Sequence, residues 1–328
     1  MIAVHFQRGI ELPAHALWLD PHGARPLAFV SHAHSDHLGR HAEVIATAAT
    51  AELMRVRLGA KRIEHRMGFG ETREFRGLRV TLLPAGHILG SAQFFAESES
   101  GSLLYTGDFK LRPGLSCEAP EWRHADTLIM ETTFGRPRYV MPPAAEVLAQ
   151  MIAFCRETLD AGAVPVLLGY SLGKAQEIIC ALLQAGLTPI LHDSVFHMTE
   201  ICRGLRADFP TGYEPFDPAG VAGKVLVFPP GTQRSAALDV IPKRRTAVLT
   251  GWALDPGAHF RYGCDAAFPL TDHADYPDLL RYVELVQPRR VFTLHGFSAE
   301  YARDLRARGI EAWALNAENQ LEFKLGCD

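Results

Sequence analysis

The sequence lacks the features that would place the chain in a membrane or outside the cell. Its longest apolar stretches, such as Val164–Leu168 and Ala247–Thr250, are far too short to cross a bilayer. The N-terminus has no basic segment followed by a long apolar core, so no signal peptide is expected. The cysteines form no CxxC pair and are predicted to be free thiols in a reducing compartment. These absences predict a cytoplasmic protein without membrane contact.

The sequence also lacks an excess of positive charge. It has 33 lysines and arginines and 37 acidic residues, and the net charge is −4. A protein that binds nucleic acid usually carries a basic footprint, and the total charge shows none. Local clusters of basic residues remain, and the simplest interpretation of each is a solvated surface: Arg136 and Arg138, Lys243–Arg245, and Arg289 with Arg290.

What the sequence does contain is an ordinary globular composition with many histidines. The 328 residues allow two domains or one large one, and 48% hydrophobic residues are enough for a full core. Histidine, of which there are 15, is the commonest metal ligand and a frequent acid or base near neutral pH. The function therefore depends on whether these histidines gather at one place.

Short apolar runs alternate with amphipathic patterns along the chain, so we expect an α/β fold. The first 130 residues are rich in strand patterns, whereas about 140–250 alternates helix and strand and predicts a small parallel sheet. Plausible boundaries are Pro142–Pro143 and Asp255–Gly263. Strands are predicted at Leu27–Val30, Val80–Leu83, Leu103–Tyr105, Thr127–Met130, Val164–Leu168, Thr188–Leu191, Val225–Phe228, Thr246–Leu249 and Val291–Leu294. Helices are predicted at Ala144–Leu159, Lys174–Leu183, Tyr276–Val286 and Ala299–Arg308.

The strongest motif is SHAHSDH, at residues 31–37, which directly follows a predicted strand. His32 and His34 share a direction if the backbone is extended, and Asp36 and His37 come from the following turn. Imidazole nitrogens bind zinc at about 2.0–2.1 Å, and carboxylate oxygens bind at a similar range. The motif predicts a metal site, against the alternative of a solvated histidine-rich loop.

Other predicted strands also end in candidate ligands. His87 and Asp108 each follow a strand and a glycine, Glu131 ends a strand, and His295 lies between a strand and Gly296. A further histidine, His273, precedes a helix. Alone, each is more typical of a turn or a helix cap. Together with the SHAHSDH motif, they supply further imidazoles and carboxylates for metal binding.

A glycine-containing turn at Gly169–Lys174 ends one predicted strand and opens the next helix. Backbone N–H groups at a helix start suit an anionic oxygen. The turn is not a Walker A loop, because it is one residue short and has Ala175 where Ser or Thr is needed. With Ser171 and Lys174, it predicts a site for an anionic oxygen, with simple helix capping as the alternative.

Taken in order, these residues resemble a known signature. His32-x-His34-x-Asp36-His37, His87 and Asp108 resemble the metallo-β-lactamase superfamily. Glu131, His273 and His295 resemble motifs A, B and C of its β-CASP nucleases. The strings PAGHILGSAQ, ETTFG, YSLGKAQE and TDHADYPDLL are similar to those of bacterial ligase-associated DNA damage response exonucleases. The resemblance implies an αββα sandwich built from residues 1–137 and 266–328, with a β-CASP domain inserted at 138–265.

The resemblance also implies two divalent metal ions. Zinc suits imidazole-rich ligation, with manganese as the alternative, and such a pair activates water for attack on phosphorus. The first ion would be held by His32, His34 and His87, and the second by Asp36, His37 and His295, with Asp108 bridging them.

The catalytic residues implied by the resemblance are Asp36, Asp108, Glu131 and His273. His273 would protonate the leaving O3′, and Glu131 would orient its ring and favour the imidazolium. The phosphate pocket resembles that of the Artemis-type nucleases, in which a 5′ phosphate docks. Its residues here would be Tyr170, Ser171, Gly173 and Lys174.

The resemblance favours a DNA-repair exonuclease, linked in function to an ATP-dependent DNA ligase and a DEXH helicase. The first alternative is a ribonuclease like RNase J or the cleavage factors, because Artemis-type enzymes lack a histidine at the position of His295. A non-catalytic β-CASP scaffold is less consistent with a full set of ligands. A small-molecule hydrolase would not need Glu131, His273 or the inserted helix–strand segment.

Overall fold

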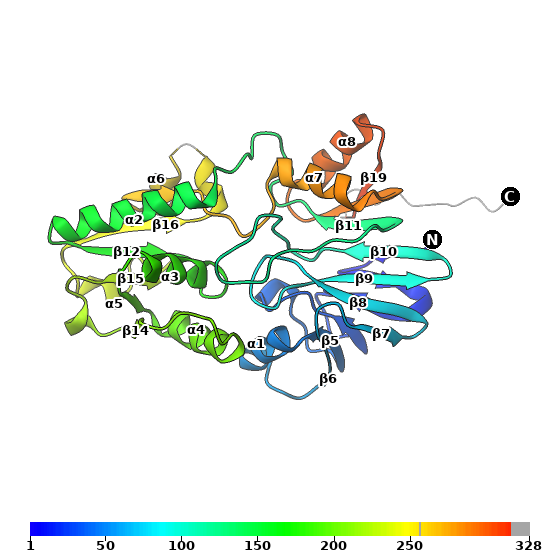
Figure 1. The fold of residues 1–328 in the computed structure, drawn as a ribbon, viewed down its shortest axis with the longest axis horizontal. Helices are drawn as coiled ribbons and strands as arrows, with labels where there is room; N and C mark the ends of the chain where they lie inside the picture. The colour runs from blue at the N-terminus through cyan, green and yellow to red at the C-terminus, as the bar shows by residue number, and fades with distance from the viewer. Residues whose placement is uncertain (256, 316–328) are drawn as a thin grey trace.

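The computed structural model describes residues 1–255 and 257–315, and these residues form three β-sheets, the third of which lies beside the other two (Figure 1). The mixed α/β class expected from the sequence is confirmed. Within the described residues, no helix is both long and apolar enough to cross a bilayer. Five cysteines are buried free thiols, namely Cys117, Cys155, Cys180, Cys202 and Cys264; Cys327 lies outside the described residues.

Two sheets face each other and form one core. The first sheet has the order β1-β2-β3-β4-β5-β6 and the second β19-β18-β11-β10-β9-β8-β7. Apolar side chains from both sheets, such as Leu12 and Phe29 from the first and Val80 and Phe94 from the second, share one buried cluster. The first sheet comprises β1 (His5–Phe6), β2 (Ile10–Leu12), β3 (Leu17–Leu19), β4 (Leu27–Phe29), β5 (Glu43–Thr47) and β6 (Ile63–Met67). The second comprises β7 (Thr72–Phe75), β8 (Leu78–Pro84), β9 (Ala92–Ser98), β10 (Gly101–Tyr105), β11 (Thr127–Glu131), β18 (Arg290–Leu294) and β19 (Glu311–Ala314).

Helices cover the outer faces of these two sheets. Helix α1 (Ala48–Leu58) packs Leu53 and Met54 against Val44 of the first sheet. Helices α7 (Tyr276–Val286) and α8 (Ser298–Ala307) pack on the second sheet, where Tyr282 and Leu305 share a core with strand residues. The layers therefore run helix, sheet, sheet, helix. Helix α1 was not predicted, because its sequence does not separate apolar and polar residues onto two faces.

The third sheet is built from the middle of the chain and lies on the left in Figure 1. Its order is β14-β13-β15-β12-β16-β17, and all its pairings are parallel, as predicted for about 140–250. Strand side chains alternate between two cores, so helices and loops bury both faces. The strands are β12 (Val164–Leu168), β13 (Pro189–Leu191), β14 (Glu214–Pro215), β15 (Val225–Phe228), β16 (Arg244–Leu249) and β17 (Ala266–Phe268). The helices around it are α2 (Ala144–Asp160), α3 (Lys174–Gln184), α4 (Asp193–Leu205), α5 (Ala236–Asp239) and α6 (Ala258–Tyr262).

Candidate metal centre and active site

The candidate ligands gather because the strands before them end at one place. β10, β11 and β18 are neighbouring parallel strands, so their carboxyl ends bring Asp108, Glu131 and His295 to the same edge. β8 runs in the same direction as β10 because both are antiparallel to β9. His87 therefore follows at the same edge of the second sheet.

Two backbone features let the loops at this edge approach each other. Gly107 has a φ of +56°, and a Cβ there would lie 2.5 Å from the Cβ of Ser31 in the opposite loop. Only glycine therefore allows the turn before Asp108 to reach the histidine motif. His295 also has a left-handed φ, of 59°, which is uncommon for a residue other than glycine and is typical of functional sites.

Four side chains form the tightest group. The Nε2 atoms of His32 and His87 each lie 3.1 Å from Nδ1 of His34. Oδ2 of Asp108 lies 3.6 Å from Nε2 of His32 and 3.9 Å from Nε2 of His87. All four residues offer a ligand atom within 4.8 Å of the others. Three imidazoles and one carboxylate at this spacing fit a divalent cation.

Each imidazole of this group is anchored through one nitrogen and presents the other to the centre. Nδ1 of His32 lies 2.9 Å from the Ser31 hydroxyl. Nδ1 of His87 donates to the backbone carbonyl of Asp272 at 2.8 Å, and Nε2 of His34 donates to the carbonyl of Leu172 at 3.1 Å. Metal-binding histidines are typically held in this way, which supports the assignment of these rings as ligands.

The electrostatics keep these rings neutral and able to bind a cation. Burial lowers the pKa of His87 to about 3, and the neighbouring imidazoles His273 and His34 contribute to the shift. Burial likewise lowers the pKa of His32 and His34. At neutral pH all three rings therefore have a free nitrogen lone pair, which metal binding requires.

A second group shares Asp108 and adds His37 and His295. Nε2 of His37 lies 3.4 Å from Oδ2 of Asp108, and the rings of His37 and His295 are 5.6 Å apart. Although burial alone lowers the pKa of His37, the carboxylates of Asp108 and Asp20 raise it well above its usual value. Asp108 thus lies between the two groups.

Asp36, which was predicted as a ligand of the second group, does not join it in the described structure. Its side chain is 71% exposed, and its Oδ2 lies 3.8 Å from Nε2 of His37. Asp36 sits in a short 3-10 turn, Ser35–His37, that points its carboxylate toward solvent. A role for Asp36 in metal binding or catalysis remains a proposal.

His273 and Glu131 form a pair beside the first group. Nδ1 of His273 and Oε1 of Glu131 are 2.8 Å apart, and the ring of His273 lies 4.8 Å from that of His87. Glu131 is fully buried and also accepts the backbone N–H groups of Phe109 and Thr133. Burial lowers the pKa of His273, but the carboxylates of Glu131, Asp108 and Asp272 together outweigh this effect and raise it to about 10. His273 is therefore an imidazolium at neutral pH, able to donate a proton from Nε2.

The turn predicted to bind phosphate is only partly open to a ligand. The backbone N–H of Gly173 donates to Oε1 of Gln176, and Lys174 is 3% exposed with its Nζ 3.1 Å from Oδ1 of Asp272. These contacts favour the capping alternative for Gly173 and Lys174. In contrast, Tyr170 is 60% exposed, and the Ser171 hydroxyl shares a contact of 3.1 Å with Ser194 at the start of α4.

The buried Lys174–Asp272 pair makes a stability prediction. Lys174→Met would leave the Asp272 carboxylate, which is 16% exposed, with the more distant His273 ring at 4.0 Å as its remaining cationic neighbour. Because breaking a buried ion pair costs about 3–5 kcal/mol, we expect a loss toward the lower end of this range. Lys224→Met is a matched control, because the Lys224–Glu214 pair at 2.6 Å is much more exposed and such pairs contribute about 1 kcal/mol or less. Urea unfolding of both variants measures the difference. Equal losses of unfolding free energy in the two variants would contradict the assignment of Lys174 and Asp272 as a stabilising ion pair.

Sequence reasoning missed two residues that support the site. Asp20 is buried, and its Oδ2 accepts hydrogen bonds from the Ser31 and Tyr105 hydroxyls and from Nδ1 of His37. Asp272 positions His87 and pairs with Lys174. Asp20 follows the strand β3 directly, so the same strand-then-ligand pattern that selected Asp108 could have found it.

Comparison with known proteins agrees with the arrangement of these residues. No family model matches the chain. A probable DNA ligase of Opitutus terrae is 54% identical over 98% of this chain, although the chain spans only 32% of that protein's length. An RNase J-like protein of Methanocaldococcus jannaschii is 25% identical over 81% of this chain and 80% of its own length. The 5′ exonuclease Apollo of Gallus gallus is 26% identical over 83% of this chain and 59% of its own.

A solved structure supports the fold independently. A protein of unknown function from Enterococcus faecalis superimposes with a TM-score of 0.60 over 84% of this chain and 76% of its own, at 14% identity. Such a likeness concerns the fold alone. The sequence relatives, together with the motifs at Asp108, Glu131 and His295, confirm the resemblance drawn above to the metallo-β-lactamase/β-CASP nucleases.

Proposed function

We propose that the chain is a metal-dependent exonuclease of DNA repair that hydrolyses phosphodiester bonds of single-stranded DNA and prefers a 5′ phosphate. The observation that carries this proposal is the shared location of the His/Asp groups and the His273–Glu131 pair around Asp108. The relatives named for nuclease and ligase activities support nucleic acid, and DNA in particular, as the substrate. The ligase in the name of one relative supports a functional link to DNA joining.

The residues divide the chemistry between them. When bound, divalent cations at these groups supply a nucleophile near neutral pH and offset the charge that builds on the phosphoryl oxygens. His32, His34 and His87 would hold the first cation. His37, His295 and Asp36 would hold the second, and Asp108 lies between the two groups. His273 donates a proton to the departing O3′, and Glu131 fixes its ring and charge.

The overall organisation follows from the same assignment. We propose that residues 1–137 and 266–328 are the metallo-β-lactamase domain, which holds the two facing sheets, and that residues 138–265 are the inserted β-CASP domain. Because β17 (Ala266–Phe268) pairs with β16, the third sheet extends past this boundary to Phe268. The carbonyl of Leu172, in the loop after β12, accepts a hydrogen bond from His34. The third sheet therefore presents a loop directly to the metal centre, as an inserted substrate-binding domain would.

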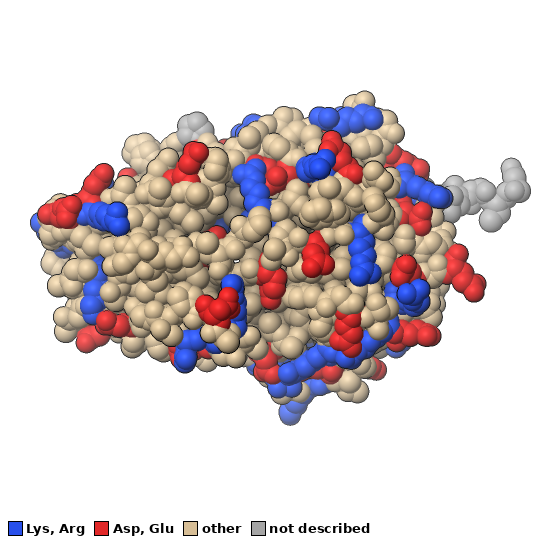
Figure 2. Space-filling view, in the orientation of Figure 1, with Lys and Arg blue, Asp and Glu red and all other residues tan. Residues whose placement is uncertain are grey.

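The net charge of −4 suggests that the substrate's charge is met locally. Figure 2 shows basic and acidic side chains interspersed over the face that it presents. This distribution favours recognition at the metal centre and at a terminal phosphate over broad contact with a duplex. Tyr170 and Ser171, which remain accessible, are the proposed contacts for a 5′ phosphate.

The proposal is tested by metal analysis together with degradation of matched oligonucleotides. We expect bound divalent metal, most simply zinc, and faster degradation of 5′-phosphorylated than of 5′-hydroxyl single-stranded DNA. Slow turnover on DNA and fast turnover on RNA of the same sequence would instead favour the second candidate, a ribonuclease like RNase J. His295 favours that candidate, since it joins the second group here.

Ser171 gives a sharper test of the terminal phosphate. Ser171→Ala should lower the preference for a 5′ phosphate by about tenfold, because a hydrogen bond to a charged group contributes about 1.5–3 kcal/mol. Activity on 5′-hydroxyl DNA should stay unchanged. Ser100→Ala, at an exposed position in the turn after β9, serves as the control. An unaltered preference in Ser171→Ala would remove this residue from the pocket.

A further inference from the structure

A cavity of about 290 Å³ opens beside His295, and none of the roles assigned above uses it. It is lined by polar groups of Asp20, Tyr105 and His295 and by apolar side chains of β1, β2, β3 and β18. The cavity borders the second ligand group, because His295 lines it and Asp20, which also lines it, accepts a hydrogen bond from His37 at 2.8 Å. It therefore belongs to the surroundings of the reacting phosphate.

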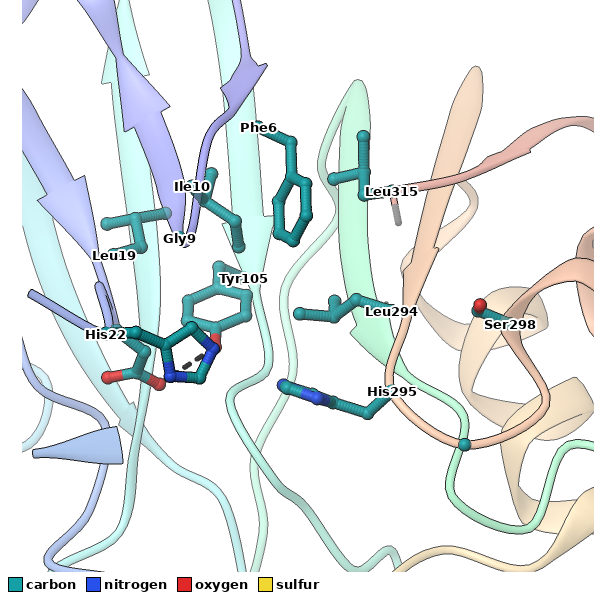
Figure 3. Close-up of a pocket in the computed structure, with 12 residues that line it drawn as sticks. Phe6, Gly9, Ile10, Leu19, His22, Tyr105, Leu294, His295, Ser298 and Leu315 are labelled. Atoms are coloured by element: carbon teal, nitrogen blue, oxygen red, sulfur yellow. Dashed lines mark hydrogen bonds between the residues drawn. The ribbon is translucent and has the colours of Figure 1, made fainter. Parts of the chain in front are cut away.

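The walls of the cavity have a distinctive chemistry. In Figure 3 the imidazoles of His22 and His295 lie to either side of the cavity, and the ring of Phe6 lies above them in the view. Ile10 and Leu19 line one apolar side. His22 is exposed, whereas both aliphatic residues are buried. A planar group in the cavity would contact these rings and the aliphatic side chains while its edge stays near polar atoms.

The size and chemistry of the cavity fit a nucleobase. A cavity of about 150 Å³ holds a benzene ring, so 290 Å³ accommodates a larger heterocycle. Single-stranded nucleic acids are commonly bound by stacking of bases on aromatic side chains, at about 1–3 kcal/mol per base. An apolar pocket with a few polar groups is also the usual form of a small-ligand site.

The position of the cavity selects one nucleotide. His273, the proposed donor to the leaving O3′, lies beside His87, whereas the cavity lies beside His295, which groups with His37. In an in-line displacement the leaving nucleoside and the nucleoside that keeps the phosphate are attached to different oxygens of the phosphorus. The leaving nucleoside is thus expected near His273, and the nucleoside that keeps the phosphate is expected near His295.

We propose that the cavity lined by Phe6, His22 and His295 binds the base of the nucleotide on the 3′ side of the cleaved bond. This inference rests on the proposed nuclease function. It makes the cavity a positioning site, because holding that base fixes the phosphate between the two ligand groups. In a strand degraded from its 5′ end, the bound base belongs to the second nucleotide.

Kinetics with abasic substrates test the assignment. For the unaltered protein, a tetrahydrofuran abasic residue at the second position should lower kcat/KM for the first cleavage by about tenfold. The same residue at the fourth position should have little effect. In Phe6→Ala the difference between the two substrates should shrink to about threefold or less. Equal rates for the second-position and fourth-position substrates in the unaltered protein would overturn the proposal.

Phe75→Ala is a matched control, since Phe75 packs against the same core as Phe6 but does not line the cavity. It should keep the dependence on the second base. If Phe6→Ala fails to fold, His22→Ala replaces it, because His22 is exposed at the cavity mouth. Loss of the second-base effect in Phe75→Ala as well as in Phe6→Ala would also overturn the assignment.

Binding without turnover separates this inference from the nuclease function. DNA carrying 2-aminopurine at the second position, mixed with chelator-treated protein, should change its emission on binding, and Phe6→Ala should weaken that change. The same probe at the fourth position should respond less. Bound DNA with no difference between positions contradicts the base pocket. Absence of cleavage of every substrate, by contrast, contradicts the proposed function.

Discussion

Asp108→Asn is expected to abolish nuclease activity and to reduce bound metal. Oδ2 of Asp108 lies within 3.4–3.9 Å of donor nitrogens in both ligand groups, so one substitution weakens both. Metal ions in such sites contribute several kcal/mol to the transition state, which corresponds to a loss of activity of about 10³-fold or more. The measurements are metal content by mass spectrometry and the rate of degradation of 5′-phosphorylated single-stranded DNA.

Asp126→Asn provides a matched control for this experiment. Asp126, which directly precedes β11, is also a hydrogen-bonded carboxylate, bonded to Ser102 and paired with Arg289, but it is not part of either ligand group. Its substitution should leave metal content and activity unchanged. Full metal occupancy and normal turnover in Asp108→Asn would contradict the central role given to this residue.

Much of the site could be predicted from the sequence because its ligands follow strands directly. Buried strands are recognisable as apolar runs, and parallel strands bring their carboxyl ends to one edge of a sheet. Asp108 and His295 were predicted on this basis, and the structure places both beside the histidine motif. The sequence pattern therefore predicts the position of a ligand correctly where that ligand lies within a few residues of a strand end.

The prediction was weaker where a role depends on which way a side chain points. The spacing of GYSLGK suggested that Lys174 faces a phosphate, but the structure buries it against Asp272, from a segment about a hundred residues later. Asp36 is adjacent in sequence to His37 yet is largely exposed. Sequence order specifies neither burial nor side-chain direction in turns, because these depend on packing against distant segments.

Substitution of His273 is expected to remove proton donation to the leaving oxygen. General acid catalysis contributes about 10²–10⁴-fold, so His273→Ala should lower kcat by a factor in this range while metal content stays near normal. Glu131→Gln should act in the same direction, because the amide no longer stabilises the imidazolium held at 2.8 Å. His124→Ala, at an exposed histidine whose Nδ1 lies 3.3 Å from the carbonyl oxygen of Val286, is the control and should have normal kcat.

The leaving group distinguishes proton donation from a merely structural role. In a substrate with sulfur in place of the bridging O3′, the leaving group is a thiolate, which needs no proton. His273→Ala should therefore cleave this substrate nearly as fast as the unaltered protein does. Glu131→Gln should be rescued in the same way, provided that its melting temperature shows an intact fold, since Glu131 also accepts two backbone N–H groups. A defect of equal size on the oxygen and sulfur substrates would assign His273 to positioning. Asp108→Asn, which disturbs the metal ligands themselves, should be inactive on both substrates. Rescue by the sulfur substrate therefore distinguishes loss of the proton donor from loss of the metal site.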